Sequence, residues 1–68
     1  MDIIRRIEYM EALYDRALQT GQVPRELIDY YESGQWLRDY EADERGELPV
    51  TLKRGVLSQD GLWDLLNK

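Results

Sequence analysis

The chain has 68 residues, which is enough for one small domain and too few for two separate cores. It contains neither cysteine nor histidine, so disulfides, thiolate metal sites, cysteine nucleophiles and imidazole bases are excluded. The formal net charge of −5 argues against direct binding to nucleic acid, which normally requires a basic surface. No apolar run approaches the roughly 20 residues of a membrane span, and the charged N-terminal segment lacks the apolar stretch of a signal peptide. We therefore expect a cytoplasmic protein that does not enter a membrane.

The first predicted element is a helix over about 2–20. Its apolar side chains recur in steps of four and three, which is a heptad-like spacing. They are Ile3, Ile7, Met10, Tyr14 and Ala17. Asp2 is suited to cap the start of this helix, and Gly21 can end it in the left-handed conformation. These five residues form an apolar seam along the helix. Because so short a chain often gains stability by association, this apolar seam also suggests a homodimer through the helix.

Two short helices are predicted next, over about 24–33 and about 35–44. Pro24 suits the first helical position, where its missing N–H costs nothing. The predicted apolar faces are Leu27, Ile28 and Tyr31 in the first helix and Trp36, Leu37 and Tyr40 in the second. Ser33 and Gly34 can separate the two helices, and Ser33 can cap the second one. The sequence leaves open whether the two helices are continuous.

The helical spacing is lost over about 45–57, where glycine and proline punctuate the chain. This loop is rich in apolar side chains, so we expect it to be ordered and packed on the helices. Ser58 is suited to cap a last helix over about 58–67. The predicted buried side of that helix is Leu62, Trp63, Leu65 and Leu66. The predicted fold class is therefore all-α, with one domain over 1–68 that forms a small bundle of three to four short helices and one ordered apolar loop.

An acidic stretch follows the aromatic residues of the third predicted helix. Its members are Asp39, Glu41, Asp43, Glu44 and Glu47. Clustered carboxylates can hold Mg²⁺ or Ca²⁺, but an EF-hand loop starting at Asp39 would need glycine at position 44 and glutamate at position 50. A solvated acidic face that pairs with neighbouring basic residues explains the stretch more simply. No cofactor and no metal-ligand set is predicted.

Lys53 and Arg54 form the basic cluster of the second half of the chain. Such a pair before a glycine can receive a phosphate or a partner's carboxylate. Alternatively, Gly55 supplies a turn with positive φ while both basic residues pair with the acidic stretch.

The aromatic residues are concentrated in the second half of the chain. Tyr and Trp are common interface anchors, and they also fill the cores of small domains. We expect Trp36 and Trp63 to be core residues. Only one of Tyr30 and Tyr31 can point fully inward on a helix, and we assign Tyr30 to the surface as an anchor.

Many spaced residues between positions 30 and 60 resemble the signature of a known family. They are Tyr30, Tyr31, Ser33, Trp36, Asp39, Asp43, Glu44, Gly46, Leu48, Pro49, the run Leu52 to Ser58, and Asp60. The segment RIEYMEALYDRAL is similar to the opening helix of the same family. That family is the bacterial domain of unknown function 4298, small helical proteins of bacteria and their mobile elements. The resemblance implies a helical fold and a cytoplasmic compartment, but no reaction, because the family has no established activity.

The sequence favours a non-enzymatic, cytoplasmic protein-interaction module. The predicted partner-binding residues are Tyr30, Asp39, Asp43, Glu44, Lys53 and Arg54, and the carboxylates would meet a basic patch on another protein. One alternative is a small acidic inhibitor from a phage or mobile element, such as an anti-CRISPR or other anti-defence protein, that blocks a basic nucleic-acid-binding surface. The other alternative is a carboxylate-based, metal-binding enzyme that uses Asp39, Asp43 and Glu44.

Overall fold

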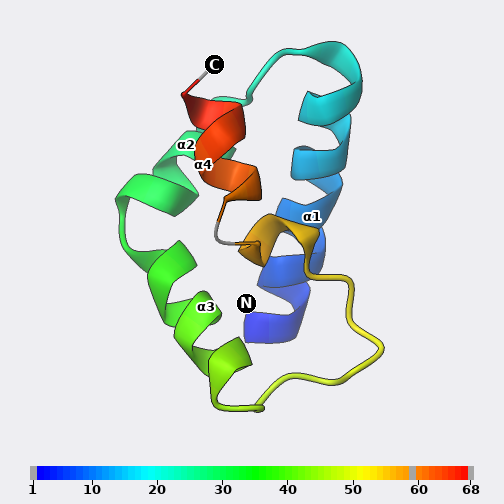
Figure 1. The fold of residues 1–68 in the computed structure, drawn as a ribbon, viewed down its shortest axis with the longest axis vertical. Helices are drawn as coiled ribbons and strands as arrows, with labels where there is room; N and C mark the ends of the chain where they lie inside the picture. The colour runs from blue at the N-terminus through cyan, green and yellow to red at the C-terminus, as the bar shows by residue number, and fades with distance from the viewer. Residues whose placement is uncertain (1, 59, 68) are drawn as a thin grey trace.

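The computed structural model describes residues 2–58 and 60–67, and this part of the chain forms four α-helices, one 3-10 turn and no strand. The elements are α1 (Ile3–Thr20), α2 (Arg25–Glu32), α3 (Gln35–Glu44), the 3-10 turn η1 (Gly55–Leu57) and α4 (Gly61–Leu66). The all-α prediction is confirmed. In Figure 1, α1 runs along one side of the molecule, α2 and α3 form the other, and η1 and α4 lie between them.

The two ends of α1 are set by Asp2 and Gly21. The Asp2 carboxylate accepts a hydrogen bond from the Arg5 backbone N–H at 2.9 Å, which satisfies one free donor of the first turn. Gly21 ends the helix with φ of 75°, a left-handed conformation that glycine adopts without steric cost. The predicted apolar seam of α1 faces the rest of its own chain, because Ile7 and Ala17 are fully buried.

Helices α2 and α3 are separate, which answers the question that the sequence left open. Gly34 has φ of 90° and forms the N-cap of α3, while Ser33 is the C-cap of α2. Ser33 is thus not the N-cap residue of α3 as predicted, but its Oγ accepts a hydrogen bond from the Gln35 N–H at 3.4 Å at the start of that helix. Pro24 is likewise the N-cap of α2 and not its first helical residue, and its carbonyl accepts from the Leu27 N–H.

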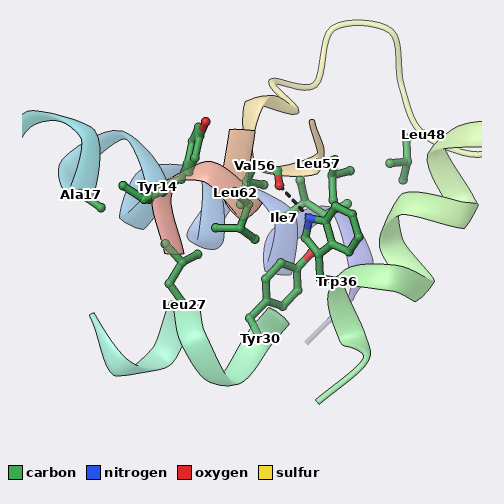
Figure 2. Close-up of a cluster of buried hydrophobic side chains, with 11 residues drawn as sticks. Ile7, Tyr14, Ala17, Leu27, Tyr30, Trp36, Leu48, Val56, Leu57 and Leu62 are labelled. Carbon is green, nitrogen blue, oxygen red and sulfur yellow. Dashed lines mark hydrogen bonds between the residues drawn. The ribbon is translucent and has the colours of Figure 1, made fainter. Parts of the chain in front are cut away.

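The core lies between α1 on one side and α2 and α3 on the other, and Val56 and Leu57 of η1 are part of it (Figure 2). Its buried members are Ile7, Tyr14, Ala17, Leu27, Tyr30, Trp36, Leu48, Val56, Leu57, Leu62 and Leu65. The Trp36 indole Nε1 donates a hydrogen bond to the Val56 carbonyl at 2.8 Å, which ties α3 to η1. Trp36 is thus a core residue, as predicted. The loop prediction is confirmed only in part, because Leu48, Val56 and Leu57 are buried whereas Val50 is 95% exposed.

Helix α4 packs closely against α1. A methyl group added at Gly61 would lie 2.5 Å from the Tyr14 hydroxyl oxygen, so only glycine fits there without a shift. The N-cap of α4 is Asp60 and not Ser58, whose Oγ accepts from the Gly61 N–H at 3.4 Å. Residue 59 of the predicted last helix lies outside the described residues. Leu62 and Leu65 are buried, but Trp63 is 52% exposed, so the prediction of a core role for Trp63 is wrong.

Candidate functional site

A buried ion cluster contains two of the predicted partner-binding residues. Asp39 is fully buried on α3, and its carboxylate accepts from the Arg6 Nε at 3.0 Å, the Arg6 Nη2 at 2.6 Å and the Tyr30 hydroxyl at 2.6 Å. Tyr30 is only 2% exposed. The assignment of Tyr30 to the surface is therefore wrong, and Asp39 does not present a free carboxylate to a partner.

The ionisation of this cluster follows from its burial. Desolvation raises the pKa of Tyr30, and the hydrogen bond to Asp39 raises it further because that bond requires the phenol proton. The hydrogen bond to Asp39 also raises the pKa of Arg6. The cluster is thus a neutral phenol and a bidentate guanidinium around one carboxylate, and it joins α1, α2 and α3.

Asp43 and Arg54 form a second internal pair. The Arg54 Nη1 donates to the Asp43 carboxylate, its Nη2 donates to the Pro49 carbonyl, and its Nε donates to the Leu52 carbonyl at 3.3 Å. Arg54 therefore fastens the segment after α3 to the end of that helix. This arrangement corresponds to the simpler alternative from the sequence, in which the basic residue pairs with the acidic stretch.

Gly55 does not form the predicted positive-φ turn, but it lies close to the Glu11 carboxylate. The positive-φ glycines among the described residues are Gly21, Gly34 and Gly46, so Gly55 does not supply such a turn. A Cβ at Gly55 would instead lie 3.0 Å from the Glu11 Oε2 atom. Glu11 is buried on α1, and its Oε1 accepts from the Val56 N–H at 2.7 Å. The carboxylate of Glu11 thus holds η1 against α1.

Glu44 and Lys53 are exposed and do not form a joint site with the other predicted residues. Lys53 lies in a groove of about 320 Å³ between α1 and the 45–54 segment, and none of the other five predicted residues lines this groove. Within residues 2–58 and 60–67, no three carboxylates are placed to hold one metal ion. The six predicted residues are thus divided between two internal pairs and two separate surface positions.

A different group of side chains, rich in aromatic residues, forms a depression on the surface of the described chain. We call it the aromatic hollow. Its volume is about 470 Å³, and it is lined by Tyr31, Trp36, Leu37, Tyr40, Asp60 and Trp63 from the α2, α3 and α4 region. Leu37 and Trp63 are each 52% exposed, which is unusual for large apolar side chains that lie together.

The rings of the aromatic hollow are packed against one another. The Trp36 ring centroid lies 5.3 Å from that of Tyr31 and 5.2 Å from that of Tyr40, with interplanar angles of 50° and 21°. Trp36 is itself fixed by its bond to the Val56 carbonyl. Because Trp36 touches both tyrosines, it holds their rings in place.

The apolar surface continues beyond the aromatic hollow. A neighbouring depression of about 370 Å³ shares Tyr31 and Trp63 with it and is also lined by Val23, Ile28, Glu32, Leu66 and Asn67. The two depressions meet at these shared aromatic residues and cover parts of α2 and α4. One signal for this surface is visible in the sequence, since Trp36 and Tyr40 are four residues apart on a helix.

The fold and this surface define a class: a small all-α domain with an ordered aromatic depression open to solvent. The chain belongs to the family described as Domain of unknown function (DUF4298), whose model matches residues 2–68. The resemblance inferred from the sequence is thereby confirmed. None of the curated proteins and none of the solved structures compared with the chain matches it. No helix in the described ranges combines the length and apolar character needed to cross a bilayer.

Proposed function

We propose that this chain is a non-enzymatic, cytoplasmic protein-interaction module that binds another protein through the aromatic hollow. The observation that carries the proposal is the half-exposed pair Leu37 and Trp63 beside the packed rings of Tyr31, Trp36 and Tyr40. Tyr and Trp dominate the binding free energy of many protein interfaces. Rings that are already fixed lose little conformational freedom on binding, which also favours a complex.

The charges around the aromatic hollow favour a basic partner. Asp60 lines the hollow, Glu32 lines the neighbouring depression, and none of the described residues that line either depression is Lys or Arg. A partner segment with an apolar residue flanked by Lys or Arg would complement this surface. The basic partner expected from the sequence is thus retained, while its docking surface moves from the acidic stretch to the aromatic hollow.

The internal pairing of the carboxylates supports binding over the two alternatives. Both oxygens of Asp39 accept hydrogen bonds from Arg6, and Asp43 pairs with Arg54. A metal-dependent enzyme would need these oxygens as ligands. An inhibitor that imitates nucleic acid would need them on the surface at phosphate-like spacing.

The test is affinity capture from the source cell with matched variants. The tagged wild-type chain, the double variant Leu37→Ser with Trp63→Ser, and the control Leu18→Ser serve as baits. Leu18 is 52% exposed like Leu37 but lies on α1, outside both depressions. We expect one protein to be retained by the wild type and by the control, and at least about tenfold less by the double variant, because each lost hot spot costs about 2 kcal/mol or more.

Circular dichroism and urea unfolding confirm that each bait is folded before capture is compared. Equal capture by the folded double variant would overturn the proposal. A loss of capture with Leu18→Ser as large as with the double variant would also overturn it, because the effect would then not belong to the aromatic hollow.

A further inference from the structure

We propose that the aromatic hollow recognises an arginine side chain of the partner protein. This inference rests on the proposed function and names the group that the surface binds. The hollow combines aromatic rings with the carboxylate of Asp60, and within residues 2–58 and 60–67 neither Lys nor Arg lines it. This is the chemistry that binds an organic cation in water.

The rings supply the first half of that recognition. An aromatic face carries a negative quadrupole, and a cation within about 6 Å of the ring centroid is attracted to it. Trp gives the strongest attraction of the aromatic residues, and Trp63 is 52% exposed at the hollow. Leu37, exposed to the same extent, offers apolar contact for the methylene groups of a long cationic side chain.

The carboxylate supplies the second half. Asp60 is exposed and is the one acidic residue among the six that line the hollow. A guanidinium can stack on a ring and still direct N–H donors to a carboxylate at the edge of that ring. The volume of about 470 Å³ is ample for one such side chain.

The geometry favours arginine over lysine or a quaternary ammonium group. Trp36 and Tyr40 stack with an interplanar angle of 21°, so these rings pack on one another and do not form the walls of a closed box. A quaternary ammonium group is best bound by rings that surround it. A planar guanidinium is weakly hydrated and stacks on a single face, whereas an ammonium ion at an open surface keeps its water.

The direct test uses three blocked tripeptides that differ only in the central residue. These are acetyl-Gly-Arg-Gly-amide, its citrulline analogue, which is close in shape but neutral, and its lysine analogue. The two tryptophan indole N–H signals are followed by ¹H–¹⁵N NMR during titration of the whole chain. We expect the arginine peptide to shift the Trp63 indole signal with a Kd on the order of millimolar, the citrulline peptide to bind about tenfold more weakly, and the lysine peptide several-fold more weakly.

Matched variants show whether arginine binding depends on Asp60 and Trp63. Asp60→Asn removes the charge but retains a residue suited to the N-cap of α4, so the helix is preserved. Asp64→Asn makes the same charge change at an exposed residue of α4 that does not line the hollow. We expect Asp60→Asn to weaken arginine binding about three- to tenfold, Asp64→Asn to change it less than twofold, and Trp63→Leu to abolish the difference between arginine and citrulline.

Three results would overturn the inference: equal binding of the arginine and citrulline peptides, equal binding of the lysine peptide, or equal effects of Asp60→Asn and Asp64→Asn. The two proposals fail separately. If the peptides do not discriminate but the Leu37→Ser, Trp63→Ser bait still loses its partner, the interaction module stands and arginine recognition is wrong. If the arginine peptide binds as expected but the double variant captures the same proteins as the wild type, the site is real and the proposed function is wrong.

Discussion

The carboxylate of Asp39 connects three helices, so we expect its removal to lower the free energy of unfolding strongly. In Asp39→Asn the Arg6 guanidinium stays partly buried without a counter-charge, and Tyr30 loses a charged acceptor. We expect a loss of about 3–5 kcal/mol in the free energy of unfolding, measured by urea denaturation, which is enough to unfold much of so small a domain.

The matched control is Asp29→Asn. Asp29 pairs with Arg25 at 3.1 Å on the exposed side of α2, where both side chains are mostly in water. Such pairs contribute little, so the control should unfold close to the wild type. Equal losses in the two variants would contradict a special role for the buried cluster.

Tyr30 should make the protein sensitive to alkaline pH. Its pKa in the folded protein is raised above the ordinary tyrosine value of about 10 by burial and by its bond to Asp39. Above about pH 10 an unfolded chain loses the phenol proton of this tyrosine, while the folded chain still keeps it. Ionisation therefore favours the unfolded chain. The stabilisation is complete below about pH 10 and is lost as the pH rises toward the folded-state pKa.

Urea unfolding between about pH 9 and pH 11.5 therefore separates the wild type from Tyr30→Phe. We expect the stability of the wild type to fall more steeply, by a difference that approaches about 1.4 kcal/mol per pH unit. Tyr9 and Tyr14 also have raised pKa values, but they are present in both proteins and cancel in the comparison. Parallel slopes would show that the Tyr30 hydroxyl does not stay protonated in the fold.

The contact between α1 and α4 depends on the absence of a side chain at Gly61. Gly61→Ala would place a methyl group 2.5 Å from the Tyr14 hydroxyl oxygen and 3.2 Å from the Ser58 Cβ. We expect this change to cost about 1–3 kcal/mol by overpacking, despite the better helix propensity of alanine.

The partner change Tyr14→Phe should relieve much of that cost, because it removes the atom that clashes. The double variant Tyr14→Phe with Gly61→Ala is therefore expected to be more stable than the two single changes predict together, with a coupling of about 1 kcal/mol in thermal or urea unfolding. Additive effects would mean that α4 moves away from α1 instead of meeting the hydroxyl.

The helices could be predicted from the sequence because their signals are local. Asp2 and Gly21 specify the ends of α1, whereas the break between α2 and α3 at Gly34 was left open by the sequence. Apart from the caps at Pro24, Ser33 and Ser58 and the turn at Gly55, the errors concern side-chain direction. Tyr30 turns inward because of Asp39, a residue on another helix that no apolar spacing reveals. Trp63 turns outward because Leu62 and Leu65 already occupy the buried side of a very short helix.

The candidate site was harder to predict for the same reason. The sequence placed it on charged residues, and the structure shows that Asp39 and Asp43 are used inside the fold. The partner of Asp39, Arg6, lies 33 positions away in the chain, so this pairing follows only from tertiary structure. Glu11 carried a weak local signal, since it lies on the same face of α1 as Ile7, where a charged side chain needs a buried partner.

The radius of gyration is 11.2 Å, close to the value of about 11 Å expected for a compact domain of this length. The seam of α1 contributes to that compactness, because Ile7 is fully buried against its own chain. Ile7→Val should therefore lower the free energy of unfolding by about 1 kcal/mol.

The way in which the urea midpoint depends on protein concentration distinguishes packing of α1 within its own chain from a dimer through α1. We expect the urea midpoint of both the wild type and Ile7→Val to stay constant between about 5 and about 500 µM protein, since only an associating fold gains stability with concentration. A midpoint that rises with concentration in the wild type, and less in the variant, would instead support the homodimer suggested by the sequence.

The segment 45–54 has a practical use that follows from its position. It leaves the end of α3 and returns to η1 on the side of α1 (Figure 1), and Val50 within it is 95% exposed. Because the chain contains no cysteine, Val50→Cys would create its single thiol, and no side chain shields that position from a maleimide reagent. A fluorescent dye attached there would report on partner binding by a change in anisotropy, without touching the residues that line the aromatic hollow.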